Sequence, residues 1–262
     1  MSIRTSSLMA APDPILGESP SSWLHRLSML HGTGATPLLR SMGIQRIGDP
    51  DVTLTTEDFF ALVRETEVSE SSVAHFSTIY QFLRPERFQP LLHRDKRRAA
   101  YGFCSTCLAE DEIPYLRTTW RFVDWTICPK HHIRIQRKCF ACDGSVRAVR
   151  PCRSTYGGNL CFCSDCDNDL RLAPVEPLSD KSVDAECEYQ QALINTFLNG
   201  YCLVEGHPEP VSLSCFNLLQ QCGQLERAVV VNRLTSAARF RLQCIDDQLF
   251  FLFLPRTDPA AI

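Results

Sequence analysis

The sequence predicts a mainly α-helical protein with a small cysteine-rich lobe at its centre. Apolar residues recur at helical spacing behind capping residues up to residue 100, paired cysteines gather after it, and helical spacing returns near 176. The predicted parts are a flexible lead-in (1–14), an N-terminal helical domain (15–100), a cysteine-rich domain (101–175) and a helical C-terminal region (176–262).

The composition of the 262-residue chain is that of an ordinary globular protein, with 44% hydrophobic residues and a net charge of −3. No stretch approaches the roughly 18 apolar residues that a membrane-spanning helix needs. The N-terminus lacks the apolar core and small-residue cleavage site of a secretory signal. We therefore expect a cytoplasmic protein.

The first helix is predicted to begin after Ser19 and to end at Gly32. Ser19 is a favourable N-cap, and Pro20 suits the first helical position. An apolar stripe follows at helical spacing: Trp23, Leu24, Leu27 and Leu30. A short helix over 36–43 and a loop over 44–54 are predicted next.

A pair of helices is predicted between Thr55 and Pro85. Thr55 and Asp58 indicate a capped start. The inward side chains are expected to be Phe59, Phe60, Leu62 and Val63 in the first helix and Val73, Phe76, Ile79, Tyr80 and Leu83 in the second. The pair is helix-turn-helix-like, but the second helix begins with the acidic, small residues 69–75 rather than with base-reading side chains. A structural helical pair is therefore favoured over a base-reading one.

The cysteine-rich domain contains C-x2-C and C-x2-H pairs, whose i, i+3 spacing on a tight turn directs both side chains at one metal ion. Zinc is the expected metal, because it prefers four thiolate or imidazole ligands in a tetrahedron. We predict two structural zinc ions in a zinc-ribbon or zinc-knuckle lobe, held by Cys104, Cys107, Cys128 and His131 and by Cys139, Cys142, Cys163 and Cys166.

Two ligand choices stay open at this point. Cys161 competes with Cys163 and Cys166 for the last two places of the second site, and His132 competes with His131 in the first. The i, i+3 spacing favours the chosen residues. A disulfide framework is disfavoured, because it is typical of short secreted chains.

The rest of the lobe and the C-terminal region have weaker patterns. Tyr115, Trp120, Phe122 and Trp125 are predicted to form a small core, and Glu110, Asp111 and Glu112 to be solvated. A short strand over 145–151 should lead to a hairpin at Gly157 and Gly158. Helices are predicted over 184–199, 212–223 and 225–243, followed by an apolar run, 249–254, that is a core segment or a partner-binding patch.

Basic residues concentrate around the lobe, with seven Lys/Arg and one Asp between 130 and 153 and six Lys/Arg and two acids between 84 and 98. They either offset the charge of the thiolate sites or contact nucleic-acid phosphates. The candidate nucleic-acid contacts are Arg94, Lys96, Arg97, Arg98, Lys130, Arg134, Arg137 and Lys138.

Two segments together resemble the TniQ family of transposition proteins, which includes the target-selecting TnsD proteins. The first is the Gly-Glu-Ser-Pro-Ser-Ser-Trp-Leu-His-Arg run at 17–26, and the second is the run from Cys104 through Pro114, Trp120 and Cys128-Pro-Lys-His131 to Cys142. The resemblance covers about residues 12 to 170, and the eight proposed ligands fall on the family's zinc-finger positions. The run 161–166 departs from the family's C-x-C-Gly, so the last two ligands stay open.

This resemblance implies a non-enzymatic target-selection adaptor for DNA transposition. Its partners would be the transposon's AAA+ ATPase and transposase, together with target DNA or a CRISPR effector complex; a homodimer is a further option. The alternative is a sequence-specific zinc-containing DNA-binding protein that recognises an attachment site or regulates transcription. A zinc enzyme is disfavoured, because four protein ligands leave no open position for water.

Overall fold

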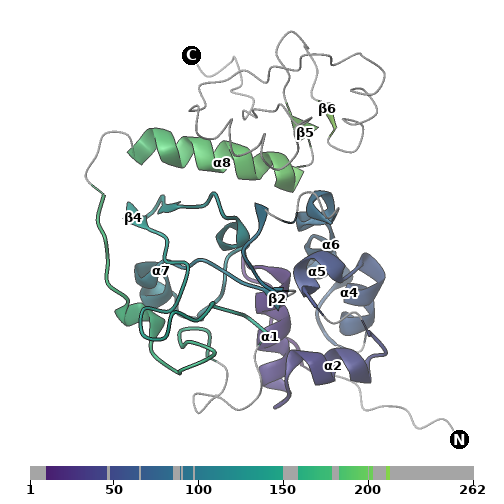
Figure 1. Ribbon diagram of the computed structural model, residues 1–262. Coiled ribbons are helices and arrows are strands. Elements are labelled where there is room, and N and C mark those ends of the chain that lie inside the picture. The colour runs from purple at the N-terminus through teal and green to yellow at the C-terminus, as the bar shows by residue number, and fades with distance from the viewer. Residues whose placement is uncertain are drawn as a thin grey trace, which may run out of the picture. The chain divides into compact units, whose positions relative to one another are not determined.

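The computed structural model describes residues 10–45, 48–64, 66–84, 89, 91–96, 98–149, 159–178, 183–199, 201–202 and 211–212 (Figure 1). The chain divides into two compact units. Unit 1 comprises Met1–Tyr80 and Leu92–Ser179, and unit 2 comprises Gln81–Leu91 and Asp180–Ile262. The four-part division proposed from the sequence stays a prediction.

Unit 1 begins with short helices, and a side-chain N-cap starts three of those described, α1, α4 and α5. They are α1 (Pro20–Leu30), α2 (Ala35–Ser41), α3 (Pro50–Thr53), α4 (Thr56–Val63), α5 (Glu70–Ala74) and α6 (Phe76–Ile79). The Ser19 side chain accepts a hydrogen bond from the Ser22 amide, as an N-cap should. Thr55 and Asp58 form a complete capping box at the start of α4.

The structure differs from the sequence prediction at several places in these helices, among them the start of α2, which is Ala35 rather than residue 36. The predicted loop 44–54 contains α3, which begins at Pro50. The predicted second helix of the pair is interrupted at His75, so that α5, α6 and the 3-10 helix η1 (Gln81–Leu83) replace one continuous helix. Leu30, the last residue of α1, is 56% exposed, and only the rest of its stripe is buried.

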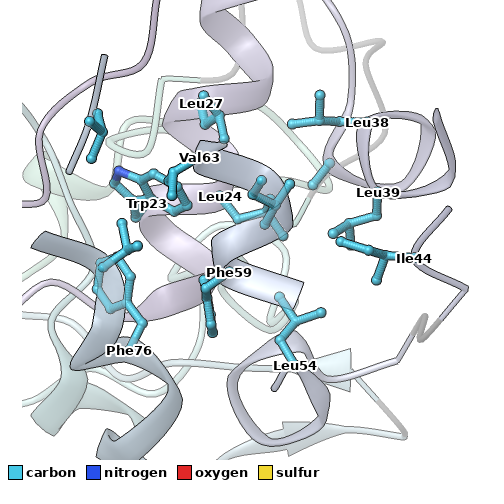
Figure 2. Packing of buried hydrophobic residues seen from close by; sticks show 14 residues of the cluster. Trp23, Leu24, Leu27, Leu38, Leu39, Ile44, Leu54, Phe59, Val63 and Phe76 are labelled. Atoms are coloured by element: carbon cyan, nitrogen blue, oxygen red, sulfur yellow. The ribbon is translucent and has the colours of Figure 1, made fainter. Parts of the chain in front are cut away.

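The helical core of unit 1 is built around three aromatic rings (Figure 2). Trp23 lies with its ring centroid 5.4 Å from that of Phe76 and 6.5 Å from that of Phe59, and the Phe59–Phe76 separation is 5.6 Å. Leucines of α1, α2 and α4 surround them. Phe60 is only partly buried against this cluster, so the inward face of α4 is narrower than predicted.

The cysteine-rich lobe of unit 1 consists of loops joined by very short elements. These are β1 (Arg94–Asp95), β2 (Arg98–Ala99), α7 (Ser105–Glu110), η3 (Thr118–Arg121), β3 (Ile127–Cys128), β4 (Ile133–Arg134) and η4 (Leu170–Leu172). β1 pairs with β2 and β3 with β4, both antiparallel. Of the predicted 145–151 strand, Ser145 and Val146 form isolated bridges, and the Gly157–Gly158 hairpin lies outside the described residues.

The segment 101–103 passes through the middle of this lobe. The Phe103 and Gln136 backbones exchange two hydrogen bonds of 2.8 Å, and the Gly102 amide donates to the Trp120 carbonyl. A Cβ at Gly102 would lie 2.5 Å from a methyl carbon of Ile135, so only glycine fits here. The predicted lobe core is buried at Trp120, Phe122 and Trp125, whereas Tyr115 is only partly buried.

Unit 2 contains the predicted amphipathic helix, α8 (Val183–Asn199). Its buried residues Val183, Gln190, Ile194 and Phe197 recur at helical spacing. The two strands β5 (Tyr201–Cys202) and β6 (Val211–Ser212) pair antiparallel. Ser212, predicted as a helix cap, therefore lies in a strand, and the predicted helices beyond it and the apolar run 249–254 fall outside the described residues.

Helices thus predominate in the described part of the chain, where sheets are only pairs of two-residue strands. None of the helices there has the length and apolar character needed to cross a membrane.

Candidate metal centres

The first cluster joins two tight turns that are separated by about twenty residues of sequence. Cys104 is the N-cap of α7, and Cys107 lies in the first turn of this helix. Cys128 ends β3, and His131 follows in the turn to β4. The three cysteines are buried, and only 12% of the His131 side chain is exposed.

The four ligand atoms of the first cluster have the spacing of a tetrahedral site. His131 Nδ1 lies 3.3, 3.3 and 3.5 Å from the sulfurs of Cys104, Cys107 and Cys128, and the Cys107 and Cys128 sulfurs are 3.6 Å apart. Zinc bonds of about 2.3 Å to sulfur and about 2.0 Å to nitrogen give edges of about 3.8 Å and 3.5 Å in a regular tetrahedron. A disulfide would need about 2.05 Å, and none joins these cysteines. The donor set therefore fits a zinc ion.

Glu110 and Asp111 contact neighbours of this cluster, although they were expected to be merely solvated. Glu110 Oε2 lies 3.0 Å from His131 Nε2 and accepts a 2.6 Å hydrogen bond from Lys130. The bond from Lys130 lowers the pKa of Glu110. Asp111 accepts two hydrogen bonds from Arg117, whose guanidinium lies 4.5 Å from the Trp120 ring centre.

The second cluster is made of four cysteines on two further turns. The Cys139 and Cys166 sulfurs are 3.6 Å apart, and those of Cys142 and Cys163 are 3.7 Å apart. These separations also match the edge of a zinc tetrahedron. Cys139 and Cys163 are buried, Cys142 is exposed and Cys166 is intermediate, so this cluster lies nearer to solvent than the first.

The structure places both alternative ligands outside the clusters. Cys161 is buried, and its thiol donates to the Leu108 carbonyl at 3.6 Å. His132 is exposed and has a left-handed backbone, with φ of 50°. The geometry therefore favours Cys163 and Cys166 over Cys161, and His131 over His132.

Most of the candidate nucleic-acid contacts have partners within the protein. Lys130 pairs with Glu110, Arg134 with Glu176 at 3.3 Å and Lys138 with Asp143 at 2.5 Å. Arg137 donates to the Val123 carbonyl, and Arg94 lies 3.9 Å from Asp49. Lys96 and Arg98 are exposed on the β1–β2 hairpin, and Arg97 lies outside the described residues.

One buried ionic network connects the helices to the lobe, and no sequence pattern predicted it. Arg121 is fully buried, and its guanidinium lies 2.5 Å from an Asp49 oxygen and 2.9 Å from an Asp51 oxygen. Asp51 also accepts from the Tyr101 hydroxyl and from the Ser21 amide, both at 2.7 Å. Burial alone would lower the pKa of Arg121, but the two carboxylates raise it above its ordinary value.

Residues 9–135 match the family model described as TniQ. The match includes the helices α1 to α6 and all four residues of the first cluster, and it ends before Cys139. No curated protein matches the chain significantly.

Proposed function

Because the chain carries a TniQ domain over residues 9–135, as its sequence pattern predicted, we propose that it is a non-enzymatic target-selection adaptor for DNA transposition. In this role it links target DNA, or a target-bound complex such as a CRISPR effector, to the AAA+ ATPase of a transposon. The strand-transfer chemistry belongs to a separate transposase, and the adaptor works in the cytoplasm. The family match is the observation that carries this proposal.

Two structural zinc ions belong to the proposal. The first would be held by Cys104, Cys107, Cys128 and His131 and the second by Cys139, Cys142, Cys163 and Cys166. A bound zinc supplies folding free energy, on the order of 10 kcal/mol for a structural site, to a lobe with few regular elements. Four protein ligands close each site, which supports a structural role rather than a catalytic one.

The proposed DNA contact is narrower than the set of eight basic residues. Lys96 and Arg98 project from a two-strand hairpin and are exposed, whereas Lys130, Arg134 and Lys138 already face carboxylates. Such a small basic surface supports sequence-independent contact with phosphates rather than a large electrostatic interface.

The helix pair α4 and α5 supports an adaptor more than a base-reading protein. α5 has only five residues, and Glu70 occupies its first turn. Val73 is buried on its inner side. A reading helix would instead offer Arg, Lys, Asn or Gln to base edges.

The test is a binding assay of the purified zinc-loaded chain against the ATPase and transposase encoded beside it, with and without target DNA. We expect a stable complex with the ATPase and weak DNA binding that is indifferent to sequence. High affinity for one DNA site, with loss on few base changes and no complex with the ATPase, would instead establish the DNA-binding alternative.

A further inference from the structure

Both ring nitrogens of His131 have defined partners. Nδ1 faces the three sulfurs of the first cluster at 3.3 to 3.5 Å, and Nε2 faces Glu110 Oε2 at 3.0 Å. A histidine binds a metal through an unprotonated nitrogen, so its ring proton must be on the other nitrogen. In this cluster the proton therefore belongs on Nε2, and the Nε2–H can donate a hydrogen bond to the Glu110 carboxylate.

Glu110 is placed by the same helix that places the thiols. It is the last residue of α7, which Cys104 caps and which contains Cys107. The next residue, Asp111, is held by two hydrogen bonds from Arg117. These bonds hold the residue that directly follows Glu110 at the C-terminal end of α7.

A simple surface ion pair is the competing explanation for this contact. Glu110 and Lys130 are 46% and 65% exposed, and exposed pairs of this kind contribute about 0–1 kcal/mol to stability. The His131 contact is different, because its ring is 12% exposed and its other nitrogen belongs to the cluster. A ligand that donates its second N–H to a carboxylate is held in one tautomer and orientation.

We infer that Glu110 is a positioning residue of the first metal site: it accepts the Nε2–H of His131 and holds Nδ1 toward the metal. This inference rests on the proposed zinc binding. The second cluster has no histidine and receives an N–H···S contact from the Asn168 side chain to Cys166 instead. A change at Glu110 should therefore act on the first site alone.

The experiment compares the full zinc-loaded chain with the variants Glu110→Ala, Glu110→Gln and Lys130→Met. Zinc affinity is measured by competition with a chromogenic chelator, and bound zinc is counted by native mass spectrometry. Nitrogen-15 NMR chemical shifts of the His131 ring identify which ring nitrogen binds the metal. They report on the first site specifically.

We expect Glu110→Ala to weaken zinc binding at the first site roughly 10- to 100-fold, the usual effect of losing such a partner. Glu110→Gln should retain part of the affinity, because its amide oxygen still accepts the N–H. Lys130→Met should change the affinity less than about 3-fold, since it leaves the Glu110–His131 contact in place. The second zinc, counted by native mass spectrometry before chelator is added and present in every variant, shows that the lobe is folded.

Equal first-site affinities for Glu110→Ala and the wild type would overturn the inference. Equal losses in Glu110→Ala and Lys130→Met would also overturn it, since they would reduce the effect to surface charge. A wild-type chain that binds no zinc at His131 is a separate result, which would refute the proposed zinc site itself.

Discussion

At the scale of single residues, Arg121 is the clearest case of a side chain whose role depends on distant partners. It is fully buried beside Asp49 and Asp51, which come from the α3 region about seventy residues earlier. A buried charge without its partner is strongly destabilising, because desolvation is no longer offset. The network therefore makes the helices and the lobe of unit 1 dependent on each other.

Arg121→Met should lower the free energy of unfolding by about 3–5 kcal/mol, because it removes the cation that contacts both buried carboxylates and leaves only the more distant Arg94 near Asp49. Urea unfolding of the zinc-loaded protein measures the change. Arg171→Met is the matched control: it removes an arginine from the more exposed pair with Asp169, and we expect a loss below about 1 kcal/mol. Similar losses in the two variants would contradict the role given to Arg121.

His93 should make stability depend on acidity. Burial, and then Arg137 and Arg121, lower the pKa of His93 to about 4, whereas an unfolded histidine titrates near 6.5. Its contribution is therefore present above pH 6.5 and is lost as the pH falls toward 4.

We expect His93→Gln to lose about 1–2 kcal/mol less stability than the wild type between pH 7 and pH 5. Urea unfolding at the two pH values, with zinc present, gives this difference. Protonation of the thiolates changes the stability of both proteins alike, so its effect cancels in the comparison. His31→Gln, a change at a partly exposed histidine, serves as the control. Parallel pH profiles for the wild type and His93→Gln would show that folding does not lower the pKa of His93.

At the scale of elements, the sequence predicted correctly those features that depend on residues a few positions apart. The caps at Ser19 and Thr55 and the helix α8 are confirmed, and the i, i+3 pairs form two compact clusters. These features depend on neighbouring residues, so a local pattern suffices to predict them.

Features that depend on distant partners were missed. The pattern gave no sign that Asp49 and Asp51 would pair with Arg121, or that Glu110 would contact His131. The break at His75 was missed for a related reason, because apolar spacing alone does not distinguish one helix from two short ones.

The two clusters should release metal in a fixed order. The first has three buried cysteines, whereas the second has the exposed Cys142 and the partly exposed Cys166. Chelator should therefore remove the second zinc first, which native mass spectrometry can follow as a transient one-zinc species. In that species the nitrogen-15 NMR shifts of the His131 ring should still be those of a metal-bound histidine. If they change in the first step to those of a free ring, the order of release is the reverse.

At the scale of the whole molecule, a net charge of −3 confines any contact with DNA to local surfaces. The β1–β2 hairpin carries the exposed Lys96 and Arg98, whereas Arg134 and Lys138 face Glu176 and Asp143. Within the described residues no carboxylate pairs with Lys96 or Arg98, so these two can neutralise phosphates without breaking an ion pair there.

The double variant Lys96→Ala/Arg98→Ala should weaken DNA binding equally for all sequences. It should also reduce the slope of log affinity against log salt concentration by up to about 2, close to one unit per lost phosphate contact. Arg134→Ala/Lys138→Ala removes the same charge and is the control, with a smaller expected change. Fluorescence anisotropy across a salt series decides between them, and equal slopes for both variants would refute the hairpin contact.

Hydrogen bonds connect two segments of the TniQ match that lie far apart in the sequence. Thr118 donates its hydroxyl to the Glu18 carbonyl, and the Ser19 amide donates to the Leu116 carbonyl, so bonds span about a hundred positions of the chain. A ribosome adds about 5–20 residues each second, so Glu18 is added to the chain roughly 5–20 seconds before Thr118. During that interval the Glu18 carbonyl and the Ser19 amide of the nascent chain lack the partners that they have in the folded protein.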